Sequence, residues 1–141
     1  MTMAGTVEDG LGIAGVDLTS CLQSIRLKVK IPDLLAKTLN VRLSHDYIIN
    51  PEPELRIDAS EHHGQALSLI PCKLNGRKAI IVRADEHNTQ NVDEMERLSL
   101  FEVMSDVELR ATFNLNTGGE VTVDVDERYV SEASGEELRP Q

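Results

Sequence analysis

The stretch ALSLIPCKLNGRKAIIV, residues 66–82, carries the clearest structural signal in the chain. Its Asn75-Gly76 pair is typical of a two-residue β-turn, because such a turn requires positive φ angles that these two residue types tolerate. Apolar residues flank the turn and predict a hairpin with strands over 72–74 and 79–82. An antiparallel β fold is therefore the starting hypothesis.

Further strands are expected where apolar and polar residues alternate, which is the period of a strand with one buried face. The strand ahead of the hairpin is expected to end at Pro71, which has no backbone N–H to donate. The last strand follows a turn at residues 117–119. The strands expected outside the hairpin are 25–31, 39–43, 66–70, 98–104 and 121–125.

One short helix is expected after the strand over 98–104. Asp106 can accept hydrogen bonds from the N–H groups of a first turn, and Glu108 lies in that turn, where the helix dipole favours a carboxylate. Leu109 and Phe113 then lie four residues apart on one face. Many short strands with one short helix predict a mostly-β fold, a small barrel.

Composition and charge narrow the range of partners. The chain has 141 residues, a formal net charge of −10 and only 3% aromatic residues. Nucleic acids and anionic membranes would be repelled, and aromatic platforms for base stacking are almost lacking. We expect neither partner. A nucleotide is still compatible with the charge, because backbone N–H groups and a metal ion can hold phosphates on an acidic protein.

We divide the chain into a barrel domain, 1–126, and an acidic tail, 127–141, which lacks an apolar face and is expected to be disordered or loosely attached. The first residues have neither a basic start nor an apolar run, and no stretch approaches the roughly 20 apolar residues of a membrane span. Cys21 and Cys72 form no C-x-x-C motif. Two inert thiols in a reducing, cytoplasmic compartment are favoured over a disulfide.

Residues 10–15, Gly-Leu-Gly-Ile-Ala-Gly, match the pattern G-x-G-x-x-G. A dinucleotide fingerprint requires a buried strand before this pattern and a βαβ unit around it. Here the preceding residues are few and polar, and no βαβ unit follows. Glycines still let a backbone turn sharply and present N–H groups to oxygen atoms. A phosphate-binding loop outside a Rossmann fold and a plain loop are the two interpretations.

Four other polar side chains are candidates for ligand binding. Thr38 and Asn40 lie two residues apart at the start of a strand and share one face, where a hydroxyl and an amide oxygen suit Mg²⁺. Glu102 lies in an apolar strand and must find a partner or an open face. Arg110 can bind a phosphate through two hydrogen bonds. For each of them, plain exposure to water is the alternative.

A second polar cluster contains carboxylates and imidazoles, which bind transition metals. Adjacent histidines point in different directions along a strand and rarely bind the same ion. A solvated loop is therefore the favoured interpretation of this cluster. Its members are Asp58, Glu61, His62 and His63.

In their order along the chain, these motifs resemble the CTP-dependent riboflavin kinases of archaea. The resemblance runs from about residue 5 to residue 125. It implies a six-stranded cradle-loop barrel, and it implies transfer of the γ-phosphate of CTP to the 5′-hydroxyl of riboflavin, which yields FMN and CDP. The segments that carry it are 10–12, 38–43, 70–76, 101–103, 109–110 and 115–121.

The resemblance also implies the roles of individual residues. Mg²⁺ would be bound by Thr38 and Asn40, and the flavin would be contacted by Glu102, with Thr89 as a candidate second contact. Phosphoryl transfer needs mostly positioning and charge neutralisation, which a metal ion and a backbone cradle supply without basic residues. The implied nucleotide-binding residues are Gly10, Leu11, Gly12, Ile13, Ala14 and Gly15, followed by Glu108, Leu109, Arg110 and Ala111.

The chain departs from the family pattern close to this implied site. The glycine loop has no basic residue where the family has Arg or Lys, and Lys37 replaces the glycine that precedes Thr-Leu-Asn. A lysine at this position can reach a phosphate, or it can block a ligand. The family's helical segment with its Gly-Phe-x-Pro signature is here the alternating stretch 24–31, Thr89 lies in a polar insertion, 85–97, and Asp106 replaces a proline.

Three functional hypotheses follow, of which a purely structural or protein-interaction domain has the least support. The first is a Mg²⁺-dependent riboflavin kinase that uses CTP as the phosphate donor. The second is a catalytically altered or inactive module of the same fold, which binds a nucleotide or a flavin.

Overall fold

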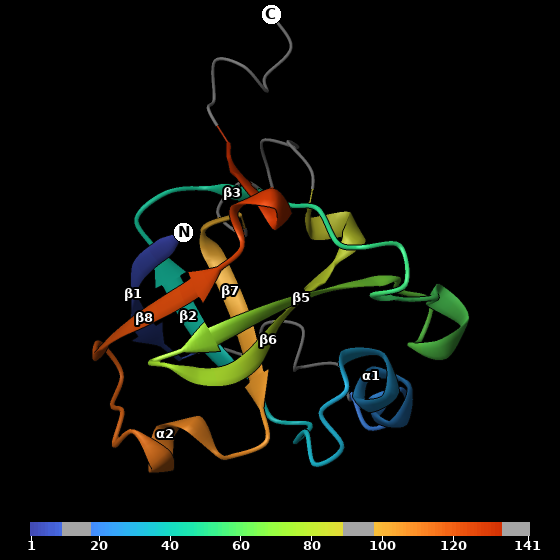
Figure 1. Cartoon of the computed structure of the whole chain (residues 1–141), viewed down its shortest axis with the longest axis horizontal. Coiled ribbons are helices and arrows are strands. Elements are labelled where there is room, and N and C mark those ends of the chain that lie inside the picture. Colours follow the sequence, from blue (N-terminus) through green and yellow to red (C-terminus); the bar gives the residue numbers. More distant parts are fainter. Residues whose placement is uncertain (10–17, 89–97, 134–141) are drawn as a thin grey trace, which may run out of the picture.

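Six antiparallel strands close into a barrel, as the sequence predicted (Figure 1). The computed structural model describes residues 1–9, 18–88 and 98–133. Around the barrel each strand pairs with the next, in the order β1, β2, β7, β6, β5, β8, and β8 pairs again with β1. The barrel strands are β1 Thr2–Glu8, β2 Leu39–Leu43, β5 Leu67–Leu74, β6 Arg77–Ala84, β7 Leu100–Ser105 and β8 Glu120–Val125.

The predicted hairpin is present as β5 and β6. Asn75 and Gly76 form its turn with φ angles of 50° and 83°, so both residues adopt the positive φ that the turn requires. The pairing around them runs from Leu74 opposite Arg77 to Leu67 opposite Ala84. The hairpin is longer than expected, because β5 continues through Pro71.

Pro71 does not end its strand, and the prediction that it would was wrong. The N–H groups of Leu69 and Asn75 donate on the side of β5 away from β6, at 2.9 and 2.8 Å, so the missing N–H of Pro71 faces that side too. There, β5 pairs first with the short strand β4, Arg56–Ile57, and then with β8 from Cys72 onward. Pro71 lies between the two partners and interrupts no ladder.

The segment predicted as a strand over 25–31 is instead a helix, α1, Leu22–Val29. Ile25 is fully buried, whereas Leu27 is 74% exposed, so the apolar face follows a helical period rather than alternation. The helix ends at Lys30, which has the left-handed φ of 59°. The alternation led to the wrong prediction because the spacing of Ile25 and Val29 fits both the period of two of a strand and the i, i+4 spacing of a helix.

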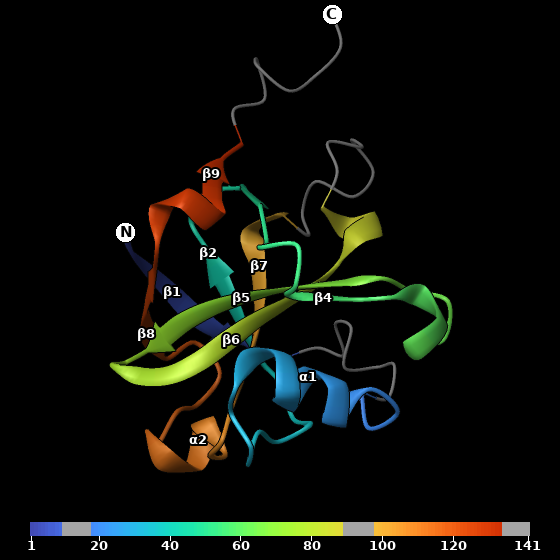
Figure 2. The same ribbon diagram turned by 45° about the vertical axis from the view of Figure 1, so that its right-hand side comes forward.

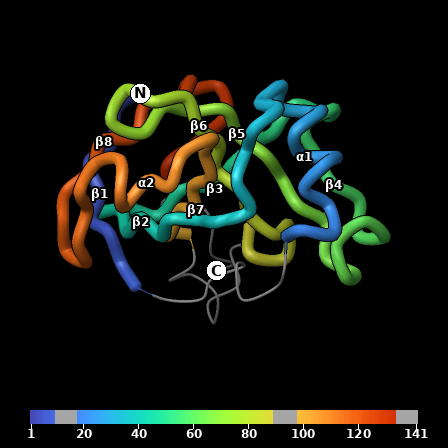
Figure 3. The backbone as a smooth tube through the Cα atoms, turned by 90° about the horizontal axis from the view of Figure 1, so that it is seen from below, coloured from blue at the N-terminus to red at the C-terminus, as the bar shows by residue number. Residues whose placement is uncertain are grey.

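The helix α1 covers the outer face of β5 and β6, on the side of the barrel away from β1 (Figures 2 and 3). Three groups of residues form this second core: those of the segment 18–34, those in and just before β4, and outward-facing residues of β5, β6 and β7. The cluster consists of Leu18, Cys21, Ile25, Ile31, Leu34, Leu55, Ile57, Leu67, Leu69, Ile80, Val82, Ala84 and Met104. The wall made by β5, β6 and β7 therefore has an apolar layer on both faces, since the barrel interior lies behind it.

The expected helix after β7 is present as a single turn, α2, Leu109–Thr112. Its N-cap is Glu108, whose carboxylate accepts a hydrogen bond from the Ala111 N–H at 2.8 Å. The prediction that Asp106 caps the helix was wrong, because that carboxylate accepts two hydrogen bonds from Arg77, at 3.0 and 3.1 Å.

The segment from Glu127 onward does not begin a loose tail, contrary to the prediction. A 3-10 turn, Glu127–Tyr129, leads into β9, Val130–Glu132, which pairs with β3, Tyr47–Ile49. Tyr129 and Val130 are buried in the barrel core, and this burial fixes the segment. Residues 134–141 lie outside the described residues. Two more 3-10 turns are present, at Ala59–Glu61 and Asp85–His87, and no helix in the described ranges is long and apolar enough to cross a membrane.

The first strand, β1, was not predicted, because Gly5 occupies one of its inward positions and hides the alternation of Met3 and Val7. A Cβ atom built on Gly5 would lie 2.4 Å from Val41 Cγ1 and 3.1 Å from the Arg42 carbonyl oxygen. The absence of a side chain thus lets β2 pack closely against β1.

The substitution Gly5→Ala is expected to destabilise the protein by about 1–3 kcal/mol, since the added methyl group overpacks the barrel interior. Urea unfolding followed by circular dichroism measures the change. The exposed neighbour Thr6, on the outer face of the same strand, is the control: Thr6→Ala should stay within about 0.5 kcal/mol of the wild type. Equal stability of Gly5→Ala and wild type would contradict the close packing.

The two cysteines do not form a disulfide, and both are buried. Burial, with a smaller contribution from the charge of Asp124, raises the pKa of the Cys72 thiol to about 12. A thiol of this pKa carries almost no thiolate near neutral pH and is unreactive.

Native protein at pH 8 is therefore expected to react with no equivalent of a thiol reagent such as dithionitrobenzoate within minutes, and with two equivalents in guanidinium chloride. Rapid labelling of one thiol in the native protein would show that the burial of that cysteine is wrong. Mass spectrometry of the labelled peptide identifies which cysteine reacted.

Candidate functional site

Segments far apart in the sequence meet where β1 ends and β2 begins, at the end of the barrel that carries α2 (Figure 1). They are the end of β1, the start of β2 with the residues before it, the middle of β7, and α2 with its N-cap. These segments include most of the described residues that the sequence assigned to a site.

Three polar residues form a row across neighbouring strands. Glu8 on β1 is in register with Asn40 on β2, and Asn40 is in register with Glu102 on β7. Residues opposite each other in an antiparallel ladder have Cα atoms about 4.5–5.5 Å apart. Their neighbours Val41 and Phe101 point into the barrel, so the row lies on its outer face. Asn40 and Glu102 are only 7% and 5% exposed.

A small hollow lies between the residues at the start of β2 and those around α2. Its volume is about 30 Å³, which is room for roughly one water molecule. On one side it is lined by the segment predicted to bind the metal, and on the other by the segment predicted to bind the nucleotide. The lining residues are Lys37, Thr38, Leu39, Val107, Glu108, Leu109 and Arg110.

Two ion pairs tie these segments together. Lys37 Nζ lies 3.4 Å from Glu108 Oε1. Arg110 Nη2 donates to Asp9 Oδ1 at 2.9 Å, and the Thr117 hydroxyl donates to the same oxygen at 2.8 Å. Asp9 directly precedes the glycine motif, so α2 fixes the end of the strand that leads into that motif. The hydrogen bond from Ala111 N–H, and then the charge of Lys37, hold the pKa of Glu108 below its ordinary value.

Glu8 is held in the row by Arg42, two residues along β2 from Asn40. Arg42 Nε and Nη2 donate to the two carboxylate oxygens of Glu8 at 2.9 and 2.8 Å, and Arg42 Nη1 donates to the Ser99 hydroxyl at 2.8 Å. The hydrogen bond from Arg42 lowers the pKa of Glu8. The sequence did not indicate Glu8, since the strand that carries it was itself missed.

Arg83 supports the part of β7 that carries Glu102. The ladder between β6 and β7 ends at Val82 opposite Glu102. Beyond it, the guanidinium of Arg83 donates to the carbonyls of Leu98 and Leu100, both at 3.2 Å. Arg83 is 3% exposed, and burial lowers its pKa to about 10, an effect that the charge of Glu102 opposes. A lone arginine in an apolar strand was the only sequence signal for this role.

The residues at this end of the barrel fit a magnesium ion by their chemistry. A threonine hydroxyl, an asparagine amide and two carboxylates all offer oxygen, the ligand that hard cations prefer. In the ranges 1–9, 18–88 and 98–133, no three His, Cys, Asp or Glu side chains gather in a way that suits a metal ion. Thr38 and Asn40 stay the metal-binding candidates that the sequence predicts.

The polar stretch 58–63 was expected to be a solvated loop, and this interpretation was wrong for His62. That residue is fully buried, with Nδ1 3.6 Å from Cys21 Sγ. Glu61 accepts a hydrogen bond from the Ser24 hydroxyl at 2.7 Å. The stretch thus packs against the helix α1.

Two groups of predicted site residues lie outside the described residues. They are the glycine motif, Gly10 to Gly15, and the candidate flavin contact Thr89. Both remain predictions from the sequence.

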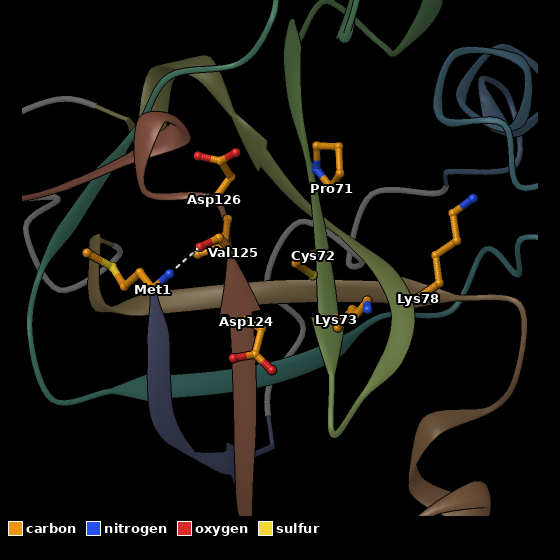
Figure 4. A pocket seen from close by; sticks show the side chains of 8 residues that line it. All are labelled: Met1, Pro71, Cys72, Lys73, Lys78, Asp124, Val125 and Asp126. Atoms are coloured by element: carbon orange, nitrogen blue, oxygen red, sulfur yellow. Dashed lines mark hydrogen bonds between the residues drawn. The ribbon is translucent and has the colours of Figure 1, made fainter.

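A larger hollow, of about 570 Å³, lies elsewhere on the barrel, at the seam between β5 and β8 (Figure 4). The seam has only three residue pairs, and the amino group of Met1 donates to the Val125 carbonyl beside it. None of the predicted site residues lines this hollow. We place the candidate site at Thr38, Asn40 and α2 because the oxygen ligands and paired charges gather there. The hollow is lined by Met1, Pro71, Cys72, Lys73, Lys78, Asp124, Val125 and Asp126.

Comparison with known proteins adds no relative: no model of a protein family matches the chain, and no curated protein matches its sequence. The resemblance to riboflavin kinases therefore rests on the order of its motifs.

If Thr38 binds the metal, Thr38→Val should weaken Mg²⁺ binding by at least about tenfold, because it removes one oxygen ligand and keeps the side-chain shape. The measurement is the rise of Tm when MgCl₂ is added in the presence of CTP. It is compared with the rise of Tm when KCl is added to the same ionic strength. Thr122→Val, on the exposed face of β8, is the matched control. The same Mg²⁺ dependence in Thr38→Val and wild type would remove Thr38 from the metal site.

Proposed function

We propose that this protein is a magnesium-dependent phosphotransferase that transfers the γ-phosphate of CTP to riboflavin and forms FMN and CDP. The observation that carries the proposal is the convergence of three segments at one end of the barrel. They are the segments that the resemblance assigns to the metal, the flavin and the nucleotide: Thr38 with Asn40, Glu102, and 108–111.

The arrangement of these residues supports phosphoryl transfer in particular. In this reaction the hydroxyl oxygen of the acceptor forms a bond to the γ-phosphorus as the bond to the β-phosphate oxygen breaks; CDP leaves, and the hydroxyl proton passes to solvent water. Positioning of the two substrates provides most of the catalysis. A bound Mg²⁺ ion supplies the neutralisation of charge on the phosphates. Thr38, which directly precedes β2, and Asn40, on the outer face of β2, would orient that ion.

Glu102 lies directly across from Asn40, so a group held by Glu102 is close to a group held by Asn40. Its carboxylate accepts hydrogen bonds, which suits the hydroxyl groups of riboflavin. The support from Arg83 and the row with Glu8 hold it on a rigid sheet rather than on a loop, an advantage for a residue that must place a substrate. The buried thiols agree with a reducing compartment, and we place the reaction in the cytoplasm.

A second candidate function is a binding module of the same fold that holds a nucleotide or a flavin without turnover. The charges around the hollow favour it. Lys37 and Arg110, the two cations that line the hollow, are each paired with a carboxylate. Each must therefore exchange its partner before it can neutralise a phosphate.

The kinase proposal predicts that protein incubated with riboflavin, Mg²⁺ and CTP forms FMN, and that ATP does not replace CTP. Chromatography of the flavins after incubation with CTP, ATP, GTP or UTP measures this. Glu102→Gln should lower the rate at least about a hundredfold, because the amide replaces a charged acceptor at the substrate. Glu120→Gln, exposed on β8, should leave the rate unchanged.

Folded protein that forms no FMN with any of the four nucleotides would refute the kinase proposal. Quenching of riboflavin fluorescence by the same protein, or a rise of its Tm with CTP, would then support the binding module.

A further inference from the structure

Lys37 stands at the junction of the two segments that form the hollow. It directly precedes Thr38, and its ammonium group reaches across to Glu108, 3.4 Å away. The side chain of Lys37 is 68% exposed, so water already surrounds most of it. A positive charge is therefore presented to solvent next to the candidate metal ligand.

The ion pair between Lys37 and Glu108 is easily broken. Exposed pairs of this kind contribute about 0–1 kcal/mol, which an anionic ligand can exceed. Of the two partners, Glu108 is the fixed one, because its other carboxylate oxygen accepts the Ala111 N–H as the N-cap of α2. Lys37 has a flexible four-carbon stem and no other hydrogen bond given by the structure in its described part, so it is the group that moves.

Arg110, the other cation of the hollow, is more restrained than Lys37. It is bound to Asp9, an oxygen of which also accepts a hydrogen bond from Thr117. Its side chain is 34% exposed, half the value for Lys37. The sequence of the glycine motif, 10–15, contains no lysine or arginine. A phosphate group that approaches Thr38 therefore meets Lys37 as the more mobile and more exposed of the two cations.

We propose that Lys37 binds the phosphate groups of the nucleotide by exchanging Glu108 for a phosphate oxygen. The inference rests on the proposed function for the identity of the ligand as a nucleotide. It adds a residue whose charge determines how tightly the phosphates are held, and it makes Glu108 a competitor of the ligand. Lys37 acts as a point charge beside the metal ligands Thr38 and Asn40, a common way in which lysine binds phosphate.

Isothermal titration calorimetry with two probes tests the proposal: CTP with Mg²⁺, and tripolyphosphate, which has no base. Lys37→Gln should weaken both probes about tenfold, because one charge-assisted hydrogen bond is lost. Lys37→Arg keeps the charge and should retain most of the affinity. Lys73→Gln removes an equal charge from an exposed position on β5 that does not line the small hollow at α2, and should bind both probes as the wild type does.

Glu108→Gln provides an opposite and independent readout. Glutamine still offers an oxygen to the Ala111 N–H, so α2 keeps its cap, but the competing negative charge is gone. Both probes should bind up to about fivefold more tightly, the factor that corresponds to an ion pair of about 1 kcal/mol.

The outcomes separate the two proposals. If the wild type forms FMN from CTP but Lys37→Gln binds both probes with wild-type affinity, the role of Lys37 is refuted and the kinase proposal stands. Unchanged or weaker binding by Glu108→Gln refutes the exchange of partners. If the wild type binds neither CTP nor tripolyphosphate, both proposals fail together.

Discussion

Closure of the barrel is the constraint on which the other features depend. β5 and β8 pair at only three positions, and the hydrogen bonds between Asn75 and Thr122 extend this seam at the hairpin turn. Closure fixes the register of every ladder, and register decides which residues face the interior, since a slip of one residue reverses the faces of a strand. The outward row of Glu8, Asn40 and Glu102 is thus a consequence of a closed barrel, as is the buried interior itself.

Local signals in the sequence predicted the parts of the fold that local physics determines. The Asn75-Gly76 turn and the alternation in β2 and β8 depend on residues close together in the chain, and they were found. The exceptions have specific causes. The strand β1 was missed because Gly5 interrupts its apolar alternation. A glycine suits this position, although glycine disfavours strands, because a side chain would clash with Val41. The period of 25–31 fits a strand and a helix equally, and only packing against the outer face of the barrel decides between them.

The candidate site was predictable in part, for the same reason. Spacing alone predicts that Thr38 and Asn40 share one face, but the position of Glu102 beside Asn40 depends on the order of strands around the barrel. The supporting contacts of Arg42 and Arg83 join residues 15 to 57 positions apart, and no local pattern predicts them. The functional assignment has a different basis, because it depends on the order of motifs and on the chemistry of this end of the barrel.

The wall made by β5, β6 and β7 is covered on both faces, and this coverage affects how readily its strands open. In β6 six successive residues, 79–84, are buried, since the barrel interior lies behind them and α1 with its neighbours lies in front. Amide protons in such a strand exchange with solvent only when most of the domain opens. Hydrogen exchange among the described strands is therefore expected to be slowest in β6, which is covered on both of its faces.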